Sequence, residues 1–117
     1  MIRIFLLLLF ITVPAIAADL ASLERTVIER AEKDPVTAEE YFIRQIEKRP
    51  APSTEEQAVY VLGMGIAAER QGKAVDALDY YAGAEALGSE TARTAALRLQ
   101  KQGYRSTMKK VFSGPSD

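Results

Sequence analysis

The side chains that most often perform chemistry in enzymes are largely missing from this chain. It contains no histidine and no cysteine, which excludes a cysteine nucleophile, a histidine-dependent triad and the usual zinc ligand sets. Carboxylates do occur in close pairs, at Glu39/Glu40, Glu55/Glu56 and Asp76/Asp79. A glycosidase-like acid and base would need one carboxyl group in an apolar pocket, whereas these pairs fall on predicted helix surfaces. The sequence therefore predicts a protein that is not an enzyme and that uses no cofactor or metal.

Glycines also fail to form a nucleotide-binding motif. Gly63 and Gly65 supply only the first two glycines of a GxGxxG fingerprint, and they lie inside a predicted helix. Each glycine within a helix costs roughly 0.8–1 kcal/mol relative to alanine. We therefore expect another part of the chain to approach the backbone closely at these two positions.

Residues 54–88 hold two amphipathic patterns at helical spacing, joined by a short turn at Gly72. The first helix is expected to begin at Ser53 or Thr54, whose hydroxyl groups suit an N-cap. The second is expected to end just before Gly88, where a helix C-terminus commonly takes a left-handed residue. This stretch predicts an antiparallel helical hairpin.

The small residues of this hairpin follow the spacing of a tetratricopeptide repeat (TPR), which the hairpin resembles. The matching positions are Met64-Gly65, Ala68, Gly72, Ala77, Tyr81 and Ala84. Val61 stands where the family has an aromatic residue, and Ser89 stands where it has a terminal proline. The match covers about a third of the chain. The resemblance implies stacked helical hairpins whose first helices line a concave groove that holds a peptide or helix of a partner.

Carried over onto this chain, the resemblance assigns five partner-binding positions to the first helix of the hairpin. These positions are Val59, Leu62, Ile66, Glu69 and Arg70. The three apolar residues would form a strip, and the two charged residues would form its polar rim. The alternative is that the strip packs against the preceding hairpin.

The flanking segments extend the helical pattern in both directions. Residues 18–49 predict an N-terminal hairpin, a degenerate repeat or cap that restarts at Asp34-Pro35. Aspartate is expected to cap the second helix of this hairpin, and proline suits its first position. Residues 50–53 form a proline-rich connection that cannot continue a helix. Residues 89–112 predict one or two further helices, beginning at a Ser89 cap, and residues 113–117 predict a flexible tail. The predicted fold is all-α, a short TPR-like solenoid of five to six helices.

Residues 1–17 have the features of a secretory signal peptide. Arg3 supplies the positive charge, Ile4–Val13 forms an apolar run, and Ala15-Ile16-Ala17 forms a cleavage site. The run is shorter than the roughly 20 residues of a membrane span, so an uncleaved anchor is only the alternative. The absence of cysteine favours a bacterial periplasmic protein over a disulfide-stapled secreted domain.

Charge is distributed unevenly along the chain, although its net value is −1. Residues 18–90 carry 15 acidic and 8 basic side chains, whereas residues 91–116 carry 6 basic and no acidic ones. The basic residues of this second part, here called the basic face, are Arg93, Arg98, Lys101, Arg105, Lys109 and Lys110. One interpretation is a solvated outer face of the last helices that can pair with the acidic surface of the preceding repeat. The other is contact with an acidic surface, such as a partner protein or anionic envelope lipid. Nucleic acid is not expected, because the net charge has the wrong sign.

These observations together predict a non-catalytic protein–protein interaction module of the cell envelope. Its partner would be another envelope protein, and a second copy of the chain is a further candidate. The alternative function is binding of an anionic envelope surface, lipid or wall polymer, through the basic face. An enzyme or enzyme regulator of unrecognised type is the least favoured class.

Overall fold

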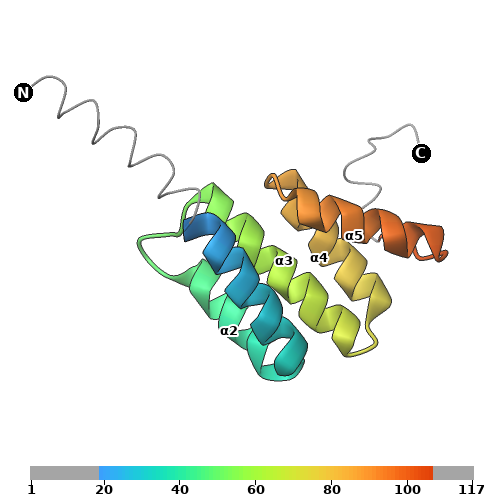
Figure 1. The fold of residues 1–117 in the computed structure, drawn as a ribbon, viewed down its shortest axis with the longest axis horizontal. Coiled ribbons are helices and arrows are strands. Elements are labelled where there is room, and N and C mark those ends of the chain that lie inside the picture. The colour runs from blue at the N-terminus through green and yellow to red at the C-terminus, as the bar shows by residue number, and fades with distance from the viewer. Residues whose placement is uncertain (1–18, 107–117) are drawn as a thin grey trace, which may run out of the picture.

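A computed structural model of the protein describes residues 19–106, and all regular secondary structure in this part of the chain is helical (Figure 1). A first helix spans residues 19–33 and is followed by α2 (Pro35–Glu47), α3 (Thr54–Arg70), α4 (Ala74–Ala86) and α5 (Glu90–Lys101). The predicted all-α arrangement of antiparallel hairpins is confirmed. The predicted signal peptide, the flexible tail and any helix beyond Ser106 lie outside the described residues.

Local polar side chains determine where several helices begin. Ser53 caps α3 in a capping box, because its hydroxyl accepts from the Glu56 amide and the Glu56 carboxylate accepts from the Ser53 amide. Ser89 caps α5 and accepts from the amide of Ala92 at 3.0 Å, as predicted. Asp34 occupies the N-cap position of α2, but its side chain makes no capping hydrogen bond, so that part of the prediction is wrong. The proline at the first position of α2 leaves one fewer amide to be capped there.

Three helices end in the same way, with a glycine in the left-handed region. Gly72, Gly88 and Gly103 have φ values of +78°, +110° and +102° after α3, α4 and α5. In the first case the amide of Lys73 donates to the carbonyl of Ala68 at 3.0 Å, which is the bond of a Schellman motif. The same pairing follows the other two glycines. The tight turns let each helix fold back against the previous one.

Helix α3 lies at the centre of the packing. It contacts α2 on one side and α4 on the other, and it also contacts α5. One core cluster joins α3 to the first helix and α2, and its members are Val27, Ala31, Ala38, Phe42, Val59, Met64 and Ala67. A second cluster joins α3 to α4 and α5, and its members are Leu62, Ala68, Ala77, Leu78, Tyr81, Ala84, Ala92, Ala96 and Leu99. Each hairpin therefore completes its core only through its neighbours.

The two glycines inside α3 permit this close packing on both of its sides. A Cβ atom at Gly63 would overlap Val27 Cγ1 and would lie 2.6 Å from Phe42 Cε2. A Cβ atom at Gly65 would lie 2.5 Å from the ring of Tyr81. The predicted close approach to the backbone is confirmed at both positions.

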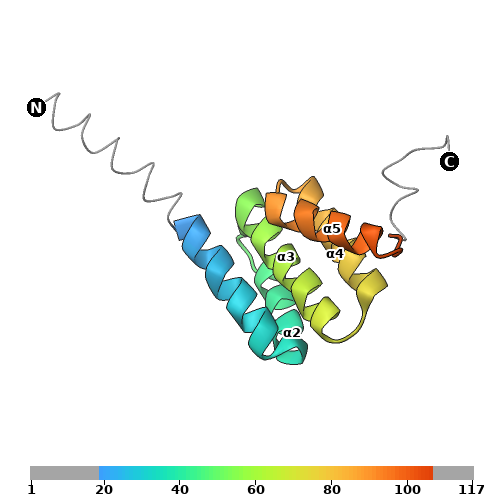
Figure 2. The same cartoon turned by 45° about the vertical axis from the view of Figure 1, so that its right-hand side comes forward.

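The N-terminal end of the first helix stands away from the rest of the molecule (Figure 2). Its later turns carry Val27 and Ala31 into the core, whereas Leu20 and Leu23 near its start remain half-buried. None of the helices within residues 19–106 has the length and hydropathy needed to cross a bilayer.

Candidate partner-binding groove

A groove runs over α3 between the first helix and α5, and it consists of two hollows. The N-terminal hollow, of about 530 Å³, is lined by Leu20, Ala21, Glu24, Glu55, Ala58, Val59, Leu87, Gly88, Ser89, Glu90 and Thr91. The C-terminal hollow, of about 650 Å³, is lined by Ile28, Glu32, Leu62, Ile66, Glu69, Arg70, Tyr81, Thr91, Ala95 and Arg98. Residue numbers rise from the first hollow to the second on all three helices. The first helix, α3 and α5 therefore run in the same direction along the groove.

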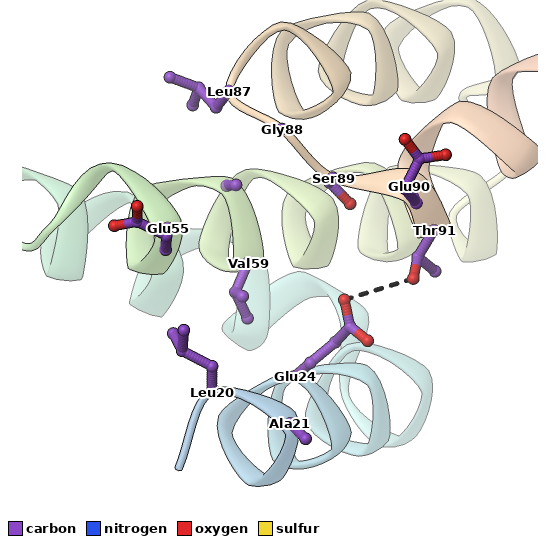
Figure 3. Close-up of a pocket in the computed structure, with 11 residues that line it drawn as sticks. Leu20, Ala21, Glu24, Glu55, Val59, Leu87, Gly88, Ser89, Glu90 and Thr91 are labelled. Atoms are coloured by element: carbon purple, nitrogen blue, oxygen red, sulfur yellow. Dashed lines mark hydrogen bonds between the residues drawn. The ribbon is translucent and has the colours of Figure 1, made fainter. Parts of the chain in front are cut away.

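Among the described residues 19–106, one side-chain hydrogen bond joins the first helix to α5 across the groove. Thr91 Oγ1 on α5 donates to Glu24 Oε1 on the first helix at 3.3 Å (Figure 3). Thr91 lines both hollows, so this bridge marks their boundary. Both side chains belong to the surface, and the bond joins helices that are 67 residues apart in the chain.

Glu69 is the most heavily bonded side chain of the C-terminal hollow. Arg98 donates two hydrogen bonds to its carboxylate, both at 2.7 Å, and the hydroxyl of Tyr81 donates a third at 2.7 Å. The bonds from Arg98 lower the pKa of Glu69, and partial burial opposes that effect. The same pairing raises the pKa of Arg98. Burial is the main reason that the pKa of Tyr81 is raised, and its hydrogen bond to Glu69 adds to this effect. This network ties α3 to both α4 and α5.

The other charged residues of the C-terminal hollow are also paired. Arg70 Nη2 on α3 lies 2.6 Å from Glu32 Oε2 on the first helix. The hollow thus contains two carboxylates and two guanidinium groups in two ion pairs, and its net formal charge is zero. Leu62 and Ile66 contribute the apolar floor beneath them.

The N-terminal hollow differs in charge. Glu24, Glu55 and Glu90 line it, and none of its described lining residues is lysine or arginine. Of these three glutamates, Glu90 forms an ion pair within residues 19–106. Its partner is Arg93, whose Nη1 lies 3.7 Å from the Glu90 carboxylate on the exposed surface of α5. Leu20, Val59 and Leu87 supply apolar lining. Within residues 19–106, no group of acidic side chains is placed to hold a metal ion.

The five predicted partner-binding residues fall along this groove but differ in accessibility. Leu62 is 0% exposed and belongs to the core, and Val59 is 8% exposed. Val59 belongs to the core cluster with the first helix and α2, the preceding hairpin, as in the alternative to the partner-binding strip, whereas Leu62 belongs to the cluster with α4 and α5. Ile66 is half-buried, whereas Glu69 and Arg70 lie at the rim and are occupied by their ion pairs.

The predicted basic face does not form one set of unpaired cations. Arg98 turns into the groove and is bound by Glu69, and Arg93 lies near Glu90. Lys101 and Arg105 are exposed and form no ion pair within residues 19–106. Lys109 and Lys110 lie outside the described residues.

The sequence interpretation missed the contribution of the first helix. Glu24, Ile28 and Glu32 line the groove and lie one repeat length, 34 residues, before Ala58, Leu62 and Ile66. That spacing was available in the sequence and could have identified them. Comparison of the chain with protein-family models, with curated proteins and with solved structures gives no match.

Proposed function

We propose that this protein is a non-catalytic, TPR-like interaction module of the cell envelope that holds a peptide or helix of a partner protein. The observation that supports this function best is the groove between the first helix and α5, with its apolar floor and its charged rim. The envelope location rests on the signal-peptide features of residues 1–17.

The interactions across the groove favour such a role energetically. The pairs Glu69–Arg98 and Arg70–Glu32 connect the three groove helices before any partner arrives. A preformed site reduces the ordering cost of association, which matters for a short groove whose interface is small. We expect modest affinity for a single segment.

Thr91 offers the sharpest test, because it is exposed and lines both hollows. In Thr91→Trp a large ring would occupy the middle of the groove. Thr94→Trp is a matched control, since Thr94 is also exposed on α5 but lines neither hollow. Both variants should retain the far-ultraviolet circular dichroism spectrum of the unmodified protein.

The readout is capture of proteins from an envelope extract by the immobilised chain 18–117. We expect one protein to be retained by the unmodified chain and by Thr94→Trp, and to be lost with Thr91→Trp. Equal retention by both variants would place the contact outside the groove and would refute the proposal, as would the absence of any specifically retained protein.

The alternative function uses the basic face to bind an anionic envelope surface. Lys101 and Arg105 support it, because both are exposed and unpaired within residues 19–106. Such binding should be lost at high salt, because exposed charges are screened within about 10 Å at 0.1 M ionic strength. Co-sedimentation with anionic vesicles that fails for Lys101→Glu/Arg105→Glu would support this alternative.

A further inference from the structure

The two hollows of the groove differ in charge, and this difference bears on what the groove can hold. The ion pairs Glu69–Arg98 and Arg70–Glu32 use all the charged side chains of the C-terminal hollow. A partner placed there meets an electrically neutral surface. The N-terminal hollow is lined by three carboxylates and by no basic side chain, and Arg93, which pairs with Glu90 at 3.7 Å, lies outside the lining. A charge preference of the groove is therefore expected to come from this end.

Two of the three carboxylates have a structural explanation, and the third does not. Glu55 and Glu90 lie in the first turns of α3 and α5, where the helix dipole favours acidic side chains. Glu24 lies well inside the first helix and receives no such stabilisation. Its hydrogen-bond partner in the structure is the neutral hydroxyl of Thr91. Bringing this third carboxylate to the same hollow concentrates negative charge at one end of the groove.

The surroundings of these carboxylates are apolar. Leu20 and Leu87 are half-buried beside the hollow, and Val59 forms part of its floor. A complementary ligand therefore needs both a positive charge and an apolar group, a combination that lysine- and arginine-containing peptides provide. Inorganic cations lack the apolar part, and no cluster of three or more acidic side chains within residues 19–106 is placed to hold a metal ion.

Resting on the proposed function, we propose that the occupant of the groove is a cationic peptide segment. Its apolar side chain enters the N-terminal hollow, and flanking lysine or arginine side chains reach Glu24, Glu55 and Glu90. The remainder of the segment crosses the Glu24–Thr91 bridge towards the neutral hollow. From Glu55 to Glu69 the floor extends about 21 Å along α3, so an extended segment of about six or seven residues spans it.

The test uses a phage-displayed library of random fifteen-residue peptides, selected against the immobilised chain 18–117. The expected pool is enriched in lysine and arginine together with at least one large apolar residue. Removing two of the three carboxylates of the hollow in Glu55→Gln/Glu90→Gln, which leaves Glu24, should weaken the binding of the selected peptides by roughly two- to thirtyfold, as expected for two solvent-exposed charge contacts. The control is Glu40→Gln/Glu47→Gln on exposed positions of α2, which line neither hollow.

The outcomes separate this proposal from the proposed function. Peptides that are neutral or acidic, that bind in the groove and that are displaced by Thr91→Trp would overturn the charge preference while supporting the groove. Cationic peptides that bind Glu55→Gln/Glu90→Gln as tightly as the unmodified chain would also overturn the charge preference. A library that yields no peptide sensitive to Thr91→Trp would overturn both proposals.

Discussion

Replacing Gly65 by alanine adds one methyl group at a crowded contact between α3 and α4. The new Cβ would lie 2.5 Å from both Cδ1 and Cε1 of Tyr81. The ring of Tyr81 is 1% exposed, and its hydroxyl is held at 2.7 Å from Glu69 Oε1. The ring therefore has little room to turn aside without breaking that bond. We expect Gly65→Ala to destabilise the protein.

The magnitude follows from three contributions. Overpacking a filled core costs about 1–3 kcal/mol. A displaced Tyr81 would also lose a hydrogen bond to a charged group, which contributes about 1.5–3 kcal/mol. The better helix propensity of alanine returns about 1 kcal/mol. The net expectation is a loss of about 0–2 kcal/mol in the free energy of unfolding if Tyr81 keeps its hydrogen bond, and of about 1.5–5 kcal/mol if the tyrosine moves.

Urea unfolding followed by far-ultraviolet circular dichroism measures this difference, with Gly83→Ala as the matched control. Gly83 is also inside a helix, but a Cβ there would lie 3.7 Å from Val61 Cγ1, an ordinary contact. That variant should therefore be stabilised by up to about 1 kcal/mol. The two substitutions are the same chemically and should have opposite signs. A Gly65→Ala protein as stable as Gly83→Ala would refute the packing argument.

Three further predictions concern stability: two describe its dependence on pH, and one concerns the turn after α4. The hydrogen bonds from Arg98 lower the pKa of Glu69 in the folded state. Its contribution to stability is therefore complete above the unfolded-state pKa of about 4.3 and is lost as the pH falls through the lower folded value. In Glu69→Gln the midpoint of urea unfolding should fall less steeply with acidification. Burial raises the pKa of Tyr81 and keeps its phenol protonated in the folded state, so stability should fall as the pH rises above about 10. Tyr81→Phe should reduce that fall, while the raised pKa values of Tyr60 and Tyr80 leave part of it. Gly88→Ala forces a side chain onto a φ of +110°, and we expect a loss of about 1–2 kcal/mol, measured as a lower melting temperature.

Each of these three has a clear contrary result. An acid limb that is unchanged in Glu69→Gln would show that other carboxylates dominate it. A Tyr81→Phe protein that loses as much stability at alkaline pH as the unmodified protein would assign the titration to other groups. A Gly88→Ala protein with an unchanged melting temperature would mean that the turn after α4 relaxes to a conformation that alanine tolerates.

Local signals in the sequence predicted the helix boundaries well. Ser53 and Ser89 cap helices through bonds to residues three positions away, and Gly88 ends a helix through its own backbone conformation. The failure at Asp34 is also local, because a capping residue type does not fix the rotamer that would make the bond. The presence of Gly63 inside a helix predicted a close contact with its backbone. The contacting residue Phe42 lies in another helix and could not be identified from spacing alone.

The accessibility of the groove residues depended on tertiary packing, and there the sequence was insufficient. Leu62 has the position of a groove residue, yet α4 and α5 together enclose its side chain. Arg98 belongs by sequence to a basic run, whereas in the fold it meets Glu69, 29 residues earlier. Which cations are neutralised depends on how successive hairpins stack, and no pattern within one helix carries that information.

The two ends of the groove differ in the described side-chain bonds that join their helices. At the C-terminal hollow, α3 is joined to the first helix through Arg70–Glu32 and to α5 through Glu69–Arg98. At the N-terminal hollow, the described side-chain link is one exposed hydrogen bond between Glu24 and Thr91, and the N-terminal end of the first helix stands away from the ribbons of the other helices (Figure 2). Exposed pairs contribute little individually, about 0.2–1 kcal/mol, but the Glu69 carboxylate is partly buried and accepts three bonds. On the proposed function, a partner therefore meets a neutral end held by two ion pairs and an acidic end held by one exposed hydrogen bond.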